Sequence, residues 1–230
     1  MRKIGSLLLI LLLLTACAAP KTAAVPKEES SSTVATKEPA AAEALVTQPA
    51  EEMTGSDILV IYFSRTGEQY GVGVIEKGNT SIVADMIAEQ TGADLFKILP
   101  VDDHYPMTYN ELTDVAKREQ NENARPAYAG EIPDLSRYDT VFIGAPVWWG
   151  DWPMICYTFF ETNADALSGK TLIPFSTHAG SGLSGFDRKL SSALPNSTVG
   201  EGLAIAGTDA QNNPDGVREK VNSWLSDLGV

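Results

Sequence analysis

Continuous apolar runs separated by helical stretches constrain the fold of this chain most. The runs cover residues 57–63, 140–144, 171–175 and 198–206, and residues 94–99 alternate between apolar and polar side chains. A strand without a polar face is typical of a parallel sheet that is covered by helices on both sides. The pattern therefore predicts a doubly wound α/β domain over residues 57–230 with five strands, in which ligands bind beyond the carboxyl ends of the strands.

Helical periodicity fills the intervals between these runs. The predicted helices cover residues 79–90, 109–122, 153–161, 184–193 and 214–228. Thr91-Gly92 ends the first helix, and Pro153 opens the third, where its missing N–H costs nothing. Strand and helix alternate along the whole domain, as a doubly wound topology requires.

The charge of the domain excludes one class of partner. Residues 57–230 hold 12 Lys and Arg against 24 Asp and Glu, so −12 of the total charge of −13 lies there. Nucleic-acid binding needs clustered cations, and we expect none here. A small anionic ligand, which needs only local donors, stays compatible with this charge.

The first 17 residues are typical of an export signal. Arg2 and Lys3 precede the leucine run 7–14, which is too short to span a membrane. The ending Leu14-Thr15-Ala16-Cys17 resembles a bacterial lipobox, which implies acylation of Cys17 and attachment to the extracytoplasmic side of the cell membrane. An ordinary signal peptide with a chance cysteine is the alternative. Residues 18–56 are rich in Ala, Pro, Ser, Thr, Glu and Lys and predict a disordered tether.

The cysteine count limits the remaining chemistry. With Cys17 lipidated, Cys156 has no partner for a disulfide, and it lies in an apolar stretch that favours an inert buried thiol. Two histidines and one free cysteine argue against a metal site of the usual type, and none is predicted.

The loop after the first strand predicts an anion site. Ser64, Thr66 and Gly67 follow the strand, and Asn79 and Thr80 open the next helix. Hydroxyl groups and free N–H groups at a helix N-terminus bind anions. Asn79 or Thr80 as a plain N-cap is the alternative. The Gly-Lys-Ser/Thr of a triphosphate-binding loop is absent from this loop.

Three tryptophans follow the 140–144 strand within a few residues. The segment reads Ala145-Pro-Val-Trp-Trp-Gly-Asp-Trp-Pro153. Indole rings at a strand end offer a stacking surface for a flat aromatic ligand, and Gly150 allows close approach of the backbone. The alternative, that Trp148, Trp149 or Trp152 packs the following helix, is acceptable for one or two of the three.

The loop after the 171–175 strand is small and polar. It reads Ser176-Thr-His-Ala-Gly-Ser-Gly182, and its N–H groups are free to contact a heterocycle. His178 has the only side chain in these loops with a pKa near neutrality, although a lone histidine is more often structural.

These three motifs, taken in order, resemble the flavodoxin family. They are Val60-Ile-Tyr-Phe-Ser-Arg-Thr-Gly67 with Asn79-Thr80, Gly144-Ala-Pro-Val-Trp-Trp-Gly150, and Pro174-Phe-Ser-Thr-His-Ala-Gly-Ser-Gly182. The resemblance is to the branch with a Trp-Trp-Gly loop, and it implies a three-layer sandwich with strand order 2-1-3-4-5 and noncovalently bound FMN. It assigns the FMN phosphate to Ser64, Thr66, Gly67, Asn79 and Thr80, and the ring to Pro146, Val147, Trp148, Trp149, Gly150, Thr177, His178, Ala179, Gly180 and Gly182.

One segment departs from the family pattern. Residues 68–78 interrupt the phosphate loop, so either Gly67 or Gly78 can serve as its glycine. A long insertion costs little when its ends meet. We expect a lid or hairpin beside the FMN, with Tyr70, Val74 and Ile75 available to touch the ring or a partner; a plain surface excursion is the alternative.

The function that follows is an FMN-binding electron-transfer protein or small oxidoreductase. The flavin supplies the chemistry, and no catalytic residue is assigned. Its partner would be a redox protein or a small-molecule electron donor or acceptor. Two alternatives stay open, an FMN-dependent quinone or NAD(P)H reductase and a cofactor-free envelope binding lipoprotein that keeps only the fold.

Overall fold

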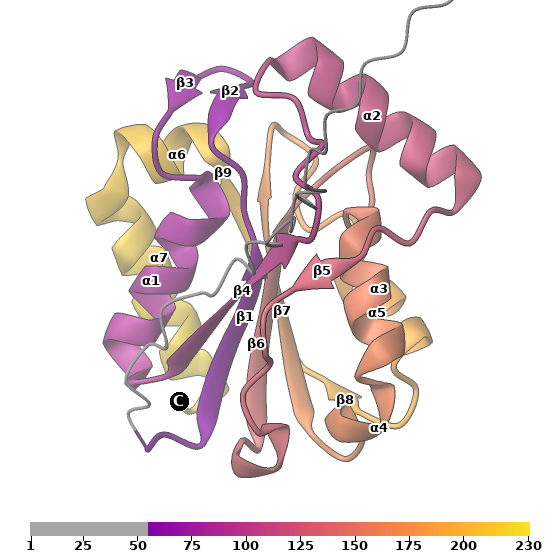
Figure 1. The fold of residues 1–230 in the computed structure, drawn as a ribbon. Helices are drawn as coiled ribbons and strands as arrows, with labels where there is room; N and C mark the ends of the chain where they lie inside the picture. Colours follow the sequence, from indigo (N-terminus) through magenta and orange to yellow (C-terminus); the bar gives the residue numbers. More distant parts are fainter. Residues whose placement is uncertain (1–54) are drawn as a thin grey trace, which may run out of the picture. The chain divides into compact units, whose positions relative to one another are not determined.

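The computed structural model describes residues 55–230, and Figure 1 shows them as one α/β domain. The predicted signal segment, Cys17 and nearly all of the predicted 18–56 tether lie outside the described residues. Within residues 55–230, no helix combines the length and the apolar character needed to cross a membrane.

The central sheet follows the predicted order. Its parallel strands are β1 (Ile58–Phe63), β4 (Asp94–Pro100), β6 (Thr140–Pro146), β7 (Thr171–His178), β8 (Thr198–Val199) and β9 (Leu203–Ala206). Their order across the sheet is β4-β1-β6-β7, and both β8 and β9 pair with β7. The order 2-1-3-4-5 is confirmed, and the last strand is split around Gly200 and Gly202, as the sequence indicates.

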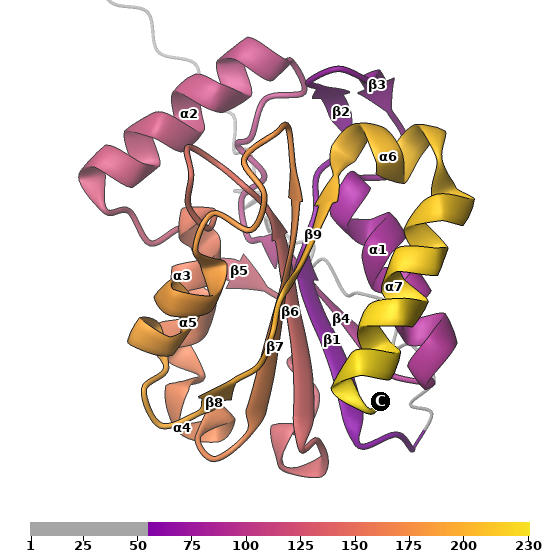
Figure 2. The ribbon, with the colours of Figure 1, turned by 180° about the vertical axis from the view of Figure 1, so that it is seen from behind.

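Helices cover both faces of this sheet. They are α1 (Asn79–Thr91), α3 (Met154–Thr162), α4 (Ala164–Leu167), α5 (Phe186–Ala193), α6 (Gly207–Asn212) and α7 (Pro214–Leu228). Figures 1 and 2 show α1, α6 and α7 on one face and α3 and α5 on the other. Each face buries its own apolar cluster, built around Phe159 and Phe160 on one side and Phe142 and Phe175 on the other.

Four small elements were not foreseen. The short strand β5 (Tyr128–Ala129) adds an antiparallel edge to β4, and a 3-10 turn forms at Leu135–Arg137. The helices α4 and α6 are also additional. Pro153 is the N-cap residue of α3, which begins at Met154. The helix α5 begins at Phe186, slightly later than predicted.

The helix α2 (Tyr109–Glu122) lies differently from the others. In both views it runs across the top of the molecule, above the carboxyl ends of the strands. Beside it stands a two-stranded antiparallel hairpin of β2 (Gly67–Gln69) and β3 (Gly73–Ile75), formed by the segment that interrupts the family pattern. Only Leu112, Ala116 and Glu119 of α2 are buried.

Cys156 lies in the core, as predicted. It is fully buried in α3, and burial raises the pKa of its thiol far above the usual range. A thiol without access to solvent and without thiolate character is chemically inert.

Candidate functional site

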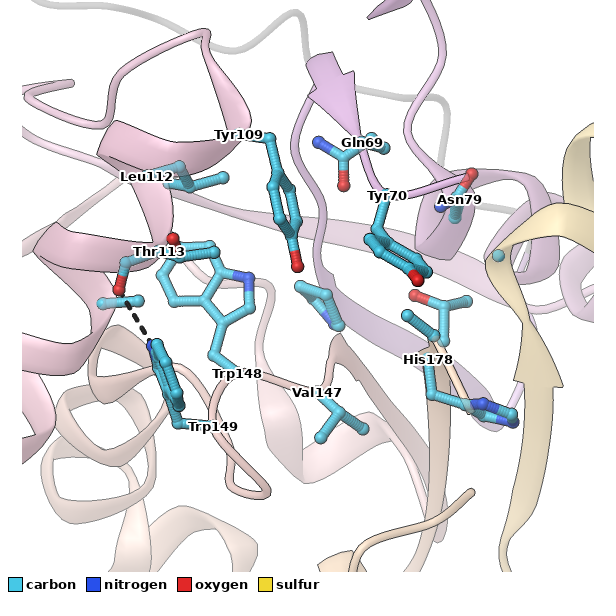
Figure 3. A pocket seen from close by; sticks show the side chains of 15 residues that line it. Gln69, Tyr70, Asn79, Tyr109, Leu112, Thr113, Val147, Trp148, Trp149 and His178 are labelled. Carbon is cyan, nitrogen blue, oxygen red and sulfur yellow. Dashed lines mark hydrogen bonds between the residues drawn. The ribbon is translucent and has the colours of Figure 1, made fainter. Parts of the chain in front are cut away.

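A cavity of about 350 Å³ opens at the carboxyl ends of the strands, as expected for this topology. Its floor comes from loops that leave the sheet and its roof from the hairpin and α2 (Figure 3). We call Asn79, Pro146, Val147, Trp148, Thr177, His178 and Ala179 the floor, and Gln69, Tyr70, Tyr109, Leu112, Thr113 and Ala116 the roof. Trp149 and Gly207 complete the lining.

The two parts of the loop that residues 68–78 interrupt meet again in three dimensions. A Cβ on Gly78 would lie 2.2 Å from Ser64 Oγ and 2.5 Å from Arg65 O, so the two segments are in direct contact. The N–H of Ser81 donates to Ser64 Oγ at 3.1 Å, which leaves the Ser64 hydroxyl proton available to a ligand. Ser64, Gly78, Asn79 and Thr80 therefore form one cradle around the start of α1.

This geometry identifies the glycine of the loop. Gly78 lies inside the cradle, where its lack of a Cβ permits the contact with Ser64. Gly67 lies in β2 and packs against the loop before α2, since a Cβ there would stand 2.7 Å from Met107 O. Thr66 does not line the cavity wall; its carbonyl oxygen faces the Gln69 amide at 3.5 Å.

Asn79 and Thr80 are not N-caps. The N-cap of α1 is Gly78, which makes no side-chain cap bond, so that alternative is wrong. Asn79 Oδ1 accepts from Gln211 Nε2 at 2.8 Å. Thr80 Oγ1 lies 2.7 Å from Thr177 Oγ1, both side chains being buried, so the cradle is fastened to the loop after β7.

The three tryptophans have three different environments. Trp152 is 1% exposed and stacks on Phe186 at 3.7 Å, so it belongs to the core. Trp148 faces the cavity and is held edge-on against Phe63 and Tyr105, with ring centroids 5.4 and 5.3 Å away. The packing alternative thus holds for Trp152, and Trp148 keeps the position of a ring-stacking residue.

Trp149 belongs to a tight turn. The backbones of Trp148 and Asp151 exchange hydrogen bonds of 2.9 and 3.0 Å, and Trp149 and Gly150 have φ values of 51° and 73°. Two positive φ angles define a type I′ turn, which favours glycine at the second position. Gly150 serves this turn and lies outside the cavity lining.

The side chain of Trp149 ties the turn to α2. Its indole N–H donates to Thr113 O at 2.8 Å (Figure 3). Gln120 Nε2 donates to Trp149 O at 3.3 Å. The Lys117 ammonium lies 5.0 Å from the indole centroid. Trp149 is 53% exposed and is bonded to α2, so its side chain holds the roof in place more than it shapes the floor.

A polar network below α2 supports the roof from the other side. The buried Glu119 carboxylate accepts from the Tyr105 hydroxyl at 3.1 Å and pairs with His104 Nε2 at 2.9 Å. The bond to Glu119 raises the pKa of His104. Arg65 donates to Tyr105 O at 2.8 Å and pairs with Asp103, which links the cradle loop to this network.

His178 is neutral near pH 7 in this environment. Burial lowers its pKa, and the N–H of Gly180 donates to Nδ1 at 3.0 Å, so the neutral ring carries its proton on Nε2. Ala179 lines the cavity, whereas Gly180 and Gly182 shape the turn behind it with φ values of 111° and 63°. No Lys, Arg, Asp or Glu side chain of the described residues lines this cavity.

Most of the roof was not foreseen. Tyr109, Leu112, Thr113 and Ala116 lie one helical turn apart on one face of α2, and this spacing was visible in the sequence. The segment 68–78 forms the expected hairpin: Tyr70 lines the cavity, Val74 is 80% exposed and Ile75 is buried. No pattern in the sequence indicates that Gln69 and Gly207 line the cavity.

A doubly wound α/β domain with a cavity at the carboxyl ends of its strands defines a class of proteins in which ligand sites lie where the strand order reverses. Within that class this chain belongs to the flavodoxin family, whose model matches residues 57–226. No curated protein sequence matches the chain.

Solved structures agree with this assignment. A candidate flavoprotein from Bacteroides eggerthii is 29% identical with a TM-score of 0.59, over 75% of this chain and 98% of that one. One from Bacteroides uniformis is 27% identical with a TM-score of 0.56, over 74% and 97%. A Lactobacillus acidophilus flavoprotein solved in complex with FMN shares the fold at 18% identity and a TM-score of 0.53, over 73% and 97%.

Proposed function

We propose that this domain binds FMN noncovalently and acts as an electron-transfer protein or small oxidoreductase. One observation carries the proposal: the two halves of the cradle are in contact despite the interruption, and Asn79 of the cradle lines a cavity with an indole wall. Membership of the flavodoxin family and the FMN bound in the Lactobacillus acidophilus relative support it.

The residues present fit the phosphate of FMN. The Ser64 hydroxyl lies beside the start of α1, where the N–H groups of Asn79 and Thr80 have no intrahelical acceptor. Such a helix N-terminus binds phosphate without any cation, in keeping with a cavity that no Lys or Arg lines. The Thr80–Thr177 bond would hold the cradle at a fixed distance from the ring-binding loops.

The ring would lie among the floor residues. Pro146, Val147 and Trp148 offer one surface, and Thr177, His178 and Ala179 border the other. FMN supplies the electron chemistry, and the protein orients the ring, excludes water and sets its electrostatic surroundings. Because the domain carries a net charge of −12, we expect the gain of negative charge on reduction to be disfavoured and the reduction potential to be low.

The location is a separate part of the proposal. Acylation of Cys17 would hold the chain on the extracytoplasmic side of the cell membrane. Replacing Cys17→Ser should move the full-length protein from the membrane to the soluble fraction of fractionated cells. Persistent membrane association would contradict the anchor and leave the FMN site untouched.

The FMN site is tested on the full-length protein. After incubation with FMN and removal of free ligand, the protein should absorb between about 350 and 500 nm, and titration should quench FMN fluorescence to saturation. A protein that neither absorbs there nor quenches FMN would refute the proposal and favour a cofactor-free binding lipoprotein.

A further inference from the structure

The roof presents more aromatic surface to the cavity than the fold requires. Tyr70 of the hairpin and Tyr109 of α2 have ring centroids 5.8 Å apart, and both project into the cavity (Figure 3). Tyr70 is 62% exposed, so it contributes little to the core. Two tyrosines from separate elements that meet at a cavity are typical of a ligand contact.

The cavity contains no charged group. Its lining has no Lys, Arg, Asp or Glu, and burial lowers the pKa of His178, so the imidazole is neutral. Placing a charge in such surroundings is costly. No Lys or Arg of the described residues lines the roof to pair with the pyrophosphate of a dinucleotide.

The roof also offers hydrogen-bond donors suited to carbonyl oxygens. The hydroxyls of Tyr70 and Tyr109 point into the cavity (Figure 3), whereas the amide N–H of Gln69 already donates to Thr66 O at 3.5 Å. The Thr113 hydroxyl is already engaged, since it donates to Asn110 O at 2.8 Å. The ligand class that combines a flat aromatic face, carbonyl acceptors and no charge is a quinone.

We propose that Tyr70 and Tyr109, with Gln69 beside them, form a subsite for a neutral quinone in the roof of the cavity. This proposal rests on the proposed FMN function, because the floor of the same cavity would hold the flavin. At this subsite the quinone gains two electrons and two protons at its carbonyl oxygens and becomes a hydroquinone. FMN, when bound in reduced form, would supply the two electrons, solvent would balance the protons, and a chemical reductant such as dithionite would replace the electrons. The uncharged lining of the cavity thus favours a quinone over NAD(P)H as the small-molecule partner.

Binding is measured on the full-length protein in mild detergent, with FMN and without it. The probes are menadione and its anionic analogue 1,4-naphthoquinone-2-sulfonate, followed by quenching of tryptophan fluorescence. We expect the neutral quinone to bind about tenfold more tightly than the sulfonate. Tyr109→Ala and Tyr70→Ala should each weaken menadione binding about tenfold while FMN affinity changes less than about threefold.

Two variants serve as matched controls. Val74→Ala lies on the same hairpin, where Val74 is 80% exposed and outside the cavity lining, and Asp114→Ala lies on the exposed face of α2. Both should bind menadione as the wild type does. Circular dichroism establishes that each variant is folded.

Each outcome decides the proposal. If the tyrosine variants lose FMN affinity and keep menadione affinity, the pair stacks on the flavin and the subsite is refuted, while the proposed function stands. Equal affinity for the two quinones would also overturn it. If the wild type binds no FMN, the proposed function fails, and menadione quenching of the FMN-free protein still shows whether the subsite exists.

Discussion

The floor and the roof of the cavity are fastened to the molecule in different ways. Floor residues follow buried strands, and the Thr80–Thr177 bond joins two side chains that are 1% and 3% exposed. Apart from the buried Glu119–Tyr105 bond, the polar groups that attach the roof are half-exposed, such as Trp149, Lys117 and His104. Exposed polar contacts contribute little stability, so the roof should open at lower free energy than the floor. A rigid floor under a more mobile roof suits a site that holds one ligand and exchanges another.

The largest effect should come from the core beneath the floor. Trp152→Ala removes a fully buried indole stacked on Phe186 and should lower the free energy of unfolding by about 3–5 kcal/mol. Denaturant unfolding measures this loss. The folded fraction should keep its FMN affinity, and a parallel loss of FMN would place Trp152 in the site.

Next in size is the cradle. Gly78→Ala inserts a Cβ 2.2 Å from Ser64 Oγ and should weaken FMN binding by about ten- to a hundredfold, because the two halves of the cradle must separate. Fluorescence titration gives the affinity. Gly200→Ala is the control, since its Cβ would meet an ordinary contact at 3.4 Å. Equal affinities for the two variants would rule out the rejoined cradle.

Loss of the indole that faces the cavity should weaken FMN binding somewhat less than the change at Gly78. Trp148→Ala removes the aromatic surface that faces the cavity, and we expect about tenfold weaker FMN binding. The Trp148→Phe variant should recover part of the lost FMN affinity in the same titration, because a smaller ring still stacks. Unchanged affinity in Trp148→Ala would show that this indole only packs against Phe63 and Tyr105.

The attachment of the roof is probed by Trp149. Trp149→Ala deletes the bond to Thr113 O and should change FMN affinity by about threefold or less, while amide exchange in α2 accelerates. Hydrogen-exchange mass spectrometry resolves α2 from the central sheet. If amide exchange accelerated equally in α2 and in the central sheet, the roof would not be held separately from the sheet.

The smallest effect is a pH dependence. The pKa of His104 is raised by its bond to Glu119, so this pair stabilises the roof fully below the unfolded value of 6.5 and the contribution fades as pH rises through the higher folded value. His104→Gln should therefore lower the melting temperature more at acidic than at alkaline pH. His178 has the opposite shift, so the difference between wild type and variant is the quantity to compare. A difference independent of pH would exclude the pair.

The contrast between floor and roof also marks how far the sequence predicts the molecule. Buried apolar runs define strands and their ends, so the strand order and the loops at 146–149 and 177–179 were correctly placed. The helix at 109–122 was predicted, but its periodicity does not say that it crosses above the sheet. That position depends on contacts between distant residues, such as Trp149 with Thr113 and His104 with Glu119.

The choice of the cradle glycine shows the same limit. Gly67 and Gly78 are equivalent in the sequence, and the tertiary contacts of Gly78 with Ser64 and of Gly67 with Met107 separate them. Gly150 was assigned to the ring because of its position in the motif, whereas the turn geometry accounts for it. Local sequence patterns thus locate the strand ends, and tertiary contacts decide which residues there face the cavity.

The buried Cys156 gives the domain a built-in reporter. It is the one cysteine of the described residues, and its thiol lies in the core. A thiol-modifying reagent can reach it only when α3 separates from the sheet, so the labelling rate measures that opening without any engineered probe. Mass spectrometry of the labelled chain would also distinguish Cys156 from Cys17, and one experiment would then report both the modification state of the N-terminal cysteine and the stability of the core.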